Sequence, residues 1–361
     1  MSSSQRIQQP EREAPRIVSA FKLLQEFKPI ESIIDGLPVG RGALVALTGP
    51  TGSGKTTLSS ELQVCLCRGL KVAGREVTQG SVLVLAGENP HDYTMHLAAT
   101  LQAKGLYGAD LARPPPFGEL LVIPGTFAID FELGYLRELI EELTTKLVAV
   151  FVDTSAAFYS ADDENDNVAM RRHASVLREL ASLPGSPTVF VLCHPTKSAQ
   201  RDNLLPRGGG AFIAEIDSNL TLFKDDAGIV TLHHAGKIRG PSFDPIRFEL
   251  VQVELEGHKD CRGRPIFSTA AKHVPDERAE QIEAKALDDE NRVMLAMLKK
   301  PGGSIAQLAQ AAGMTTGTGG PQKSKVHRLL AKLEAQRLAT KDRTGGWSLT
   351  PKGRDEANRL P

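Results

Sequence analysis

A glycine-rich turn between an apolar run and a helix-compatible segment constrains this chain most strongly. Residues 43–48, ALVALT, have the length and apolarity of a buried strand, and residues 49–56, GPTGSGKT, follow directly. The turn matches G-x-x-x-x-G-K-[ST] in the strand–turn–helix setting that this pattern requires. Its glycines let the backbone curl so that successive N–H groups point inward, and the helix N-terminus adds donors and partial positive charge. The stretch therefore predicts a cradle for the phosphates of a nucleoside triphosphate.

The pattern also assigns roles to individual side chains. Lys55 is expected to reach the β- and γ-phosphates, and Thr56 is expected to hold Mg²⁺. An ordinary glycine-rich turn is the alternative, and the agreement of both spacing and flanks argues against it. The predicted cofactors are therefore ATP and Mg²⁺. The residues expected to contact the nucleotide are Gly49, Pro50, Thr51, Gly52, Ser53, Gly54, Lys55, Thr56 and Thr57.

The distribution of charge along the chain bears on what the protein binds. The 361 residues leave room for two domains, and 43 basic residues balance 43 acidic ones. Residues 322–361 nevertheless carry ten Lys/Arg against four Asp/Glu. A basic segment on an acidic remainder favours contact with nucleic acid, although charge on a helix is more often a solvated face.

Cysteine spacing and hydropathy indicate the compartment. None of the four cysteines forms a CxxC pair, so the pattern favours buried thiols in a reducing cytoplasm over a zinc site. Residues 1–16 are polar and lack the apolar core of a signal peptide. Because no apolar stretch approaches about 18 residues, no membrane span is expected. The predicted localisation is cytoplasmic.

Alternating apolar and helical patterns organise residues 17–270 after a disordered stretch at 1–16. Apolar runs of strand length recur at 81–86, 121–123, 147–152 and 188–193, with helical patterns between them. This alternation predicts an α/β domain whose mostly parallel sheet is covered on both faces. Runs at 219–223, 229–233 and 246–254 are expected to extend the sheet as an antiparallel meander.

Three chemically active residues close three of these strands. Parallel strands present their carboxyl ends on one edge of a sheet, where ligands bind, so Glu88, Asp153 and His194 should meet the glycine-rich turn there. Asp153 is read as the Mg²⁺ carboxylate, with a strand-terminal cap as its alternative. Glu88 is read as a general base, with a surface acid as its alternative. His194 could sense the γ-phosphate or be structural.

The C-terminal quarter reads as a separate small domain. A linker is expected at 271–287, and a winged helix-turn-helix domain at 288–361. The domain would contain helices at 288–300, 305–312 and 322–336 and a hairpin at 338–350. Its third helix would face nucleic acid, although a protein-interaction domain is the alternative and the Gly-rich connection at 314–321 is long for this fold. The expected contacts are Lys323, Lys325, Arg328 and Lys332.

The motifs, in their order, resemble a known family. The segments GPTGSGKTT, VLAGEN, VFVDTSAAFYSADDENDN, VFVLCHPTK and GKIRGPS look like those of the RecA/DnaB-like ATPases. More narrowly, they resemble the RepA-type hexameric replicative helicases of plasmids and phages, often labelled AAA-family ATPases. The likeness covers about residues 17–255. It implies a RecA-like P-loop NTPase core in which Glu88 is the catalytic base, Asp153 coordinates Mg²⁺ through water and His194 senses the γ-phosphate.

The resemblance also implies partners. Lys237 and Arg239 would reach the phosphates of a neighbouring subunit, with Arg207 as the other candidate finger. The loop at 195–210 would line a central channel and contact single-stranded DNA through Lys197, Arg201 and Arg207, whereas the loop at 160–167 is acidic. The prediction is a homo-hexameric DNA helicase of a mobile element that also contacts duplex DNA through its C-terminal domain. The alternatives are a DNA-bound ATP switch or initiator that does not unwind, and a P-loop small-molecule kinase.

Overall fold

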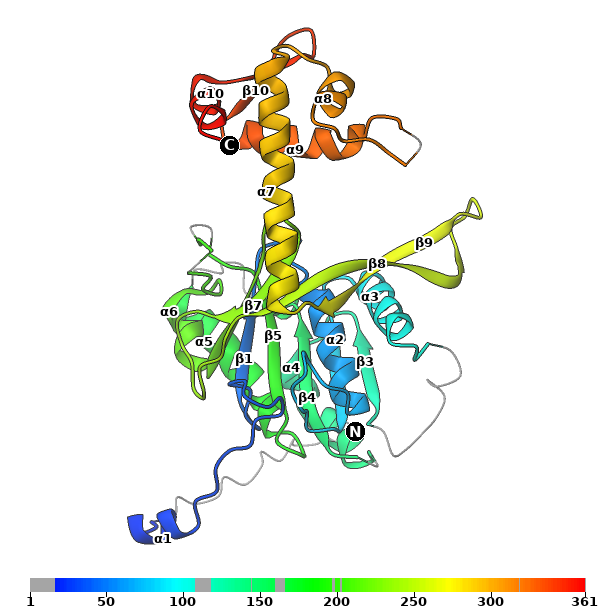
Figure 1. Cartoon of the computed structure of the whole chain (residues 1–361). Helices are drawn as coiled ribbons and strands as arrows, with labels where there is room; N and C mark the ends of the chain where they lie inside the picture. The colour runs from blue at the N-terminus through cyan, green and yellow to red at the C-terminus, as the bar shows by residue number, and fades with distance from the viewer. Residues whose placement is uncertain are drawn as a thin grey trace, which may run out of the picture. The chain divides into compact units, whose positions relative to one another are not determined.

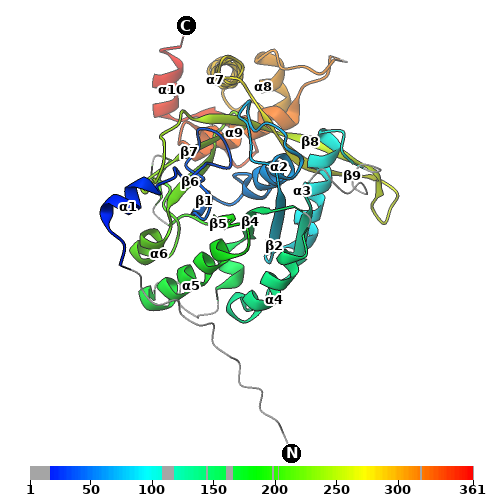
Figure 2. The ribbon, with the colours of Figure 1, turned by 90° about the horizontal axis from the view of Figure 1, so that it is seen from below.

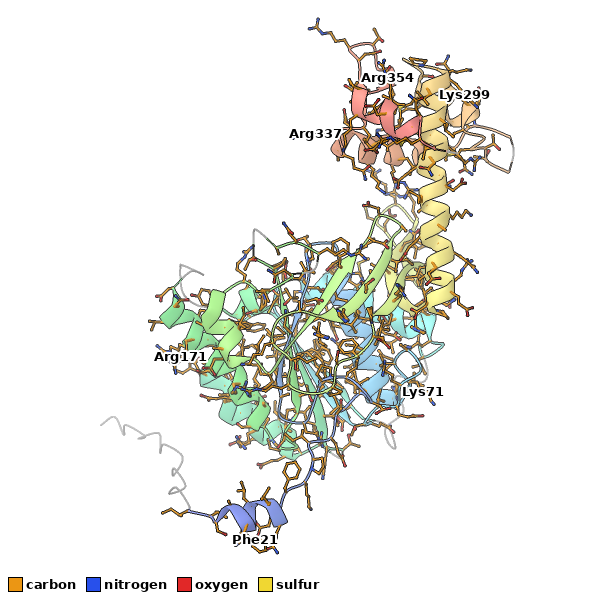
Figure 3. All side chains as sticks on the ribbon, turned by 60° about the vertical axis from the view of Figure 1, so that its left-hand side comes forward. Phe21, Lys71, Arg171, Lys299, Arg337 and Arg354 are labelled. Carbon is orange, nitrogen blue, oxygen red and sulfur yellow. The ribbon has the colours of Figure 1, made fainter. Side chains whose placement is uncertain are left out.

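The computed structural model describes residues 17–107, 118–143, 145–159, 166–196, 199–201, 203–317 and 319–360 (Figure 1). The chain forms two compact units, Met1–Glu31 and Ser32–Pro361. The described part of the first unit holds one short helix, α1 (Ala20–Gln25), which Ser19 caps. None of the residues in α1 is buried, and Phe21, labelled in Figure 3, is 71% exposed. The stretch expected to be disordered, 1–16, lies outside the described residues.

A nine-stranded sheet, counted within the described residues, forms the centre of the second unit. Its strand order is β3-β2-β4-β5-β1-β6-β7-β8-β9. The pairings from β3 to β6 are all parallel, and those from β6 to β9 are antiparallel. The mostly parallel sheet and the antiparallel meander are therefore both confirmed. The strands are β1 (Leu44–Thr48), β2 (Ser81–Ala86), β3 (Leu120–Pro124), β4 (Leu147–Asp153), β5 (Thr188–Cys193), β6 (Ser218–Lys224), β7 (Ile229–His234), β8 (Ile246–Lys259) and β9 (Pro265–His273).

Helices cover both faces of the parallel part of the sheet. Every residue of β1, β2, β4 and β5 is buried, as expected for strands enclosed on two sides. Figure 2 shows α2 and α3 on one face and α4, α5 and α6 on the other. Short 3₁₀ turns occupy Ser155–Phe158 and Leu180–Ser182. The helices are α2 (Lys55–Arg68), α3 (Pro90–Ala103), α4 (Ile129–Glu141), α5 (Asn167–Glu179) and α6 (Gly209–Glu215).

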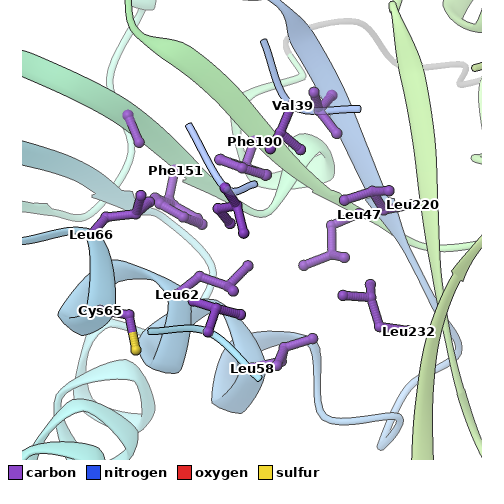
Figure 4. Close-up of a cluster of buried hydrophobic side chains, with 14 of the residues drawn as sticks. Val39, Leu47, Leu58, Leu62, Cys65, Leu66, Phe151, Phe190, Leu220 and Leu232 are labelled. Atoms are coloured by element: carbon purple, nitrogen blue, oxygen red, sulfur yellow. The ribbon is translucent and has the colours of Figure 1, made fainter. Parts of the chain in front are cut away.

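The core beneath α2 fixes the glycine-rich turn in place. Leu58, Leu62 and Leu66 of α2 are buried against the sheet, as Figure 4 shows. Phe151 of β4 and Phe190 of β5 stack beneath them, with ring centroids 4.6 Å apart. Because this packing anchors α2 from its first turn onward, the N-terminus of the helix is held at the carboxyl end of β1.

The two longest strands of the sheet, β8 and β9, continue beyond it as an arm that the sequence did not predict. The run expected to end at residue 254 continues to Lys259, and β9 pairs with it over nearly its full length. The arm lies along α3 (Figure 1), where Ala99, Leu255 and Ala270 form a small buried cluster. The last four residues of β8 are all exposed, so burial leaves no hydrophobic pattern from which the distal end of the arm could be read.

The C-terminal part follows the predicted order of elements with two differences. One helix, α7 (Asp276–Lys299), covers most of the linker expected at 271–287 together with the first expected helix, and the first three residues of that linker belong to β9. A final helix, α10, was not predicted. This part has its own core, which includes Val293, Leu308, Val326 and Trp347, and its assignment as a winged helix stays a prediction. The remaining elements are α8 (Ile305–Ala311), α9 (Lys323–Ala335), β10 (Ala339–Lys341), β11 (Trp347–Leu349) and α10 (Pro351–Ala357).

A search of the described helices for one long and apolar enough to cross a membrane finds none.

Candidate nucleotide-binding site

A cavity of about 350 Å³ opens at the carboxyl ends of the parallel strands. The glycine-rich turn forms one wall, and residues at or just beyond the carboxyl ends of β2, β4 and β5 form the adjacent wall. The predicted meeting of strand-closing side chains at one edge is therefore present in the structure. The residues that line the cavity are Thr51, Gly52, Gly54, Lys55, Thr56, Thr57, Glu88, Asn89, Asp92, His96, Asp153, Thr154, His194, Leu250 and Thr269.

The backbone of the turn requires glycine at particular positions. Gly52 and Gly54 have φ of 78° and 88°, in the left-handed region that other residues rarely adopt. A Cβ at Gly49 would lie 2.8 Å from the carbonyl oxygen of Leu222, so a side chain has no room there. Gly54 precedes α2 without a side-chain cap among the described residues, so the N–H groups of the first helical turn can serve a ligand.

Lys55 lies between the turn and the acids of the cavity. Its Nζ donates to the carbonyl oxygens of Gly49, at 2.7 Å, and Pro50, at 3.2 Å. Burial lowers the pKa of Lys55, while the carboxylates of Asp153 and Glu88 act in the opposite direction. The predicted lysine therefore stands within electrostatic reach of both predicted acids.

Asp153 is buried beside Thr56 and Lys55. Burial raises the pKa of Asp153 to about 6; a hydrogen bond from Thr56 and the charge of Lys55 lower it, and the carboxylate of Glu88 adds to the rise. A hydroxyl and a carboxylate in contact supply the oxygen ligands that Mg²⁺ takes in nucleotide sites. The arrangement fits the predicted pair of Mg²⁺ residues.

Ser53 provides an independent sign that the turn is built for an anion. Its Oγ is buried and has no hydrogen-bond partner among the described residues. A buried hydroxyl without a partner is costly in a folded protein. A phosphate oxygen would satisfy it, so the residues present fit a bound polyphosphate.

His194 connects the cavity to the loop that follows β5. Its carbonyl oxygen accepts a hydrogen bond of 2.8 Å from the N–H of Arg207, and Pro195 bridges to Pro206. The loop thus leaves and re-enters the fold beside His194. Arg207 lines a small second cavity with His194 and Ser155. Of the predicted DNA contacts in this loop, Lys197 lies outside the described residues, and the guanidinium of Arg201 lies 4.8 Å from the ring centre of Phe223.

Lys237 and Arg239 do not line the cavity of their own chain. Arg239 forms an ion pair of 2.7 Å with Asp217, which lies just before β6 at the amino end of the sheet. Lys237 donates to the carbonyl oxygen of Ala214, at 2.5 Å. The glycine-rich turn begins at the opposite end of β1, about 16 Å away for five residues that rise about 3.3 Å each.

Sequence reasoning missed one side of the cavity. Asp92 and His96 come from α3, while Leu250 and Thr269 come from the arm. The Asp92–His96 spacing of four residues places both on one face of α3, which was a readable signal. No local pattern connects α3 with residues more than 150 positions further along the chain.

The four basic residues predicted on α9 do not form one free basic face. Lys325 pairs with Asp289 of α7 at 2.5 Å, and Lys332 pairs with Glu290 of the same helix. Lys323 and Arg328 are exposed, and neither takes part in an ion pair within the described residues. The packing of α9 on α7 therefore brings acids to two of the four predicted contacts, and the contact of this helix with nucleic acid stays a prediction.

Comparison with known proteins gives one matching family model and a set of similar solved structures. The family model described as an AAA domain matches residues 8–200, slightly more than half of the chain. No match is found among the curated proteins. Similar solved structures include a DnaB-like replicative helicase described with its interactions with primase, at 13% identity and a TM-score of 0.47, covering 64% of each chain. They also include the ATPase domain of G40P, at 13% identity and a TM-score of 0.45, covering 64% of this chain and 92% of that one.

Proposed function

The chain belongs to the AAA-domain family, and from that premise we propose that it is an ATP-hydrolysing motor that acts on DNA, specifically a RepA-like replicative helicase of a mobile element. The observation that carries the proposal is the single cavity shared by Lys55, Thr56, Glu88, Asp153 and His194. A phosphate cradle alone needs none of the last three. Together they supply what hydrolysis of a phosphoanhydride requires.

Each side chain has a distinct task in this proposal. Glu88 takes a proton from the attacking water. Thr56 and Asp153 hold Mg²⁺, which when bound neutralises charge on the phosphate oxygens. Lys55 leaves its backbone carbonyl partners and contacts the β- and γ-phosphates. His194 hydrogen-bonds the γ-phosphate. When the γ-phosphate leaves, the loss of this hydrogen bond shifts the loop that begins at Pro195.

Action between subunits is part of the proposal. Lys237 and Arg239 lie at the opposite end of the sheet from the glycine-rich turn of their own chain, which supports a role at the cavity of a neighbouring copy in the proposed homo-hexamer. A guanidinium supplied in this way stabilises charge in the transition state and makes hydrolysis depend on assembly. Arg239→Ala subunits mixed into wild-type protein should reduce activity more than in proportion to their share. A linear decline would remove Arg239 from this role.

The experiment that tests the main proposal measures two outputs together. Phosphate release from ATP and Mg²⁺ is followed with and without single-stranded DNA, and strand displacement is followed on a forked duplex. DNA-stimulated hydrolysis with displacement is the expected result. An absence of ATP hydrolysis under all of these conditions would contradict the proposal.

A second candidate function is a DNA-bound ATP switch or replication initiator that does not unwind. It is favoured by the C-terminal part, which has its own core and presents Lys323 and Arg328 to solvent on one helix. Such a unit suits duplex DNA at a fixed site. DNA-stimulated hydrolysis without strand displacement, together with tight duplex binding, would select this candidate.

A further inference from the structure

We propose that α3 and the β8–β9 arm form the nucleoside-binding half of the nucleotide cavity, with His96 as the positioning residue that fixes this half to the helix after the glycine-rich turn. The inference rests on the proposed function, because it concerns the same cavity. It assigns the wall that the hydrolysis chemistry does not use.

The arm and α3 are fastened together along their length. Apolar contacts join Ala99 of α3 to Leu255 and Ala270 of the arm. The side-chain amide of Gln102 donates to the carbonyl oxygen of Glu254, at 2.5 Å, and accepts from the N–H of Glu256, at 3.0 Å. The two elements therefore act as one wall that stands beside α2.

A cluster of polar contacts around His96 joins this wall to α2. His96 Nδ1 lies 3.2 Å from the carbonyl oxygen of Thr269 and 3.3 Å from Thr57 Oγ1. Thr57 Oγ1 also lies 3.2 Å from Thr269 Oγ1. His96 Nε2 faces the carboxylate of Asp92 at 3.5 Å. One imidazole thus contacts α2 and the arm and faces a neighbour on its own helix.

The cavity consequently has two chemically different halves. Glu88, Asp153 and His194 stand at the strand ends, where the γ-phosphate is expected. The other half is lined by Asp92, His96, Leu250 and Thr269. Leu250 lies directly on the glycine-rich turn, because a Cβ at Gly54 would be 2.9 Å from its Cδ1.

The second half suits a ribose and a base better than a phosphate. It offers an apolar side chain, a hydroxyl and a carboxylate, and a carboxylate accepts hydrogen bonds from ribose hydroxyls. The lysine that offsets the acids against phosphate oxygens, Lys55, stands with Glu88 and Asp153 in the strand-end half. An apolar side chain suits the face of a base. Thr57, on the helix that holds the phosphates, touches both His96 and Thr269, so this half adjoins the phosphate end through His96.

The test compares two ligands that differ only in the nucleoside. Dissociation constants for ATP and for inorganic tripolyphosphate, each with Mg²⁺, are measured by calorimetry on the full chain and on His96→Leu. We expect ATP binding to weaken about tenfold, the equivalent of one lost hydrogen-bonded contact, and tripolyphosphate binding to change less than twofold. In steady-state hydrolysis, KM should rise while kcat stays within about twofold, because the γ-phosphate end is untouched.

Matched variants separate positioning from general damage. His91→Leu removes an exposed histidine from the same helix outside the cavity and should leave both constants unchanged. His96→Asn keeps a polar atom near the position of Nδ1 and should recover most of the ATP affinity.

Each remaining outcome has a definite meaning. Equal weakening of both ligands would place His96 in the phosphate cradle and overturn the nucleoside assignment, as would no change in either. Failure of the unaltered chain to bind tripolyphosphate and ATP would overturn the proposed function itself, so the two ideas fail in distinguishable ways.

Discussion

The nucleotide cavity and the C-terminal part both concentrate charged side chains, but they fix those charges in different ways. In the cavity, Asp153 ends one buried parallel strand and His194 follows the next, so the backbone of the sheet carries them to one place. On α9, charged residues are spaced along a helix surface, and an acid on α7 neutralises Lys325 while Arg328 stays exposed. The end of a parallel strand fixes the position of a side chain at the edge of the sheet. A place on a helix face fixes only the direction in which the side chain points, and its neighbours depend on what packs against the helix.

Glu88→Gln is expected to have the largest effect on the cavity. Removing a general base costs about 10²–10⁴-fold in rate, while the amide keeps the shape of the carboxylate and nucleotide binding persists. Phosphate release and binding of a non-hydrolysable ATP analogue are measured side by side. Glu76→Gln, which alters an exposed ion pair with Lys71, is the control. Unchanged turnover in Glu88→Gln would show that Glu88, although it lies at a strand end in the cavity, has no role in hydrolysis.

Lys55→Ala should follow closely in size. Loss of one preorganised donor to the phosphates costs about 10²–10³-fold in hydrolysis, and binding of the nucleotide should weaken as well. Lys71→Ala, at an exposed lysine labelled in Figure 3, is the matched control. If both lysine variants retained full activity, Lys55 in the cavity would contribute no more to hydrolysis than an exposed lysine does.

The pH dependence of stability should identify Asp153. Because burial raises the pKa of Asp153 to about 6 in the folded chain, above the ordinary aspartate value of 3.8, the folded state binds the proton more tightly than the unfolded state. The group therefore destabilises the fold above pH 6, and this cost disappears as the pH falls towards 4. The free energy of unfolding is measured with denaturant at pH 5 and at pH 8. In the wild type, this carboxylate should lower it by about 1–2 kcal/mol between the two pH values, and Asp153→Asn should not show that part of the decrease. Identical pH profiles would mean that Asp153 is not buried as a carboxylate.

The smallest expected effect concerns binding of duplex DNA by the basic residues of α9. Arg328→Ala should reduce the slope of log affinity for duplex DNA against log salt by about one, because one phosphate contact is lost. Lys332→Ala should leave that slope unchanged, since Glu290 already neutralises this lysine. Fluorescence anisotropy over a salt series measures both variants. An equal reduction of the slope in both variants would indicate that the ion pair between Lys332 and Glu290 opens when DNA binds.

The sequence predicted which strand-end residues would meet at the cavity but did not predict the far wall of the cavity. Residues 43–58 carry a strand, a turn and a helix within one local pattern, so the positions of Gly49, Lys55 and Thr56 follow from it. The wall formed by His96 and Thr269 joins residues 173 positions apart. Its formation depends on how far β8 and β9 extend, which periodicity did not reveal.

By itself, the sequence determined the phosphate cradle, the alternation of strands and helices, and the order of elements in the C-terminal part, because these depend on glycine φ angles, burial periodicity and caps within short stretches. Only the tertiary structure decided which side chains meet away from the strand ends. Pairing of Arg239 with Asp217, of Lys325 with Asp289, and of His96 with Thr57 requires packing between distant segments, and local preferences do not encode that packing.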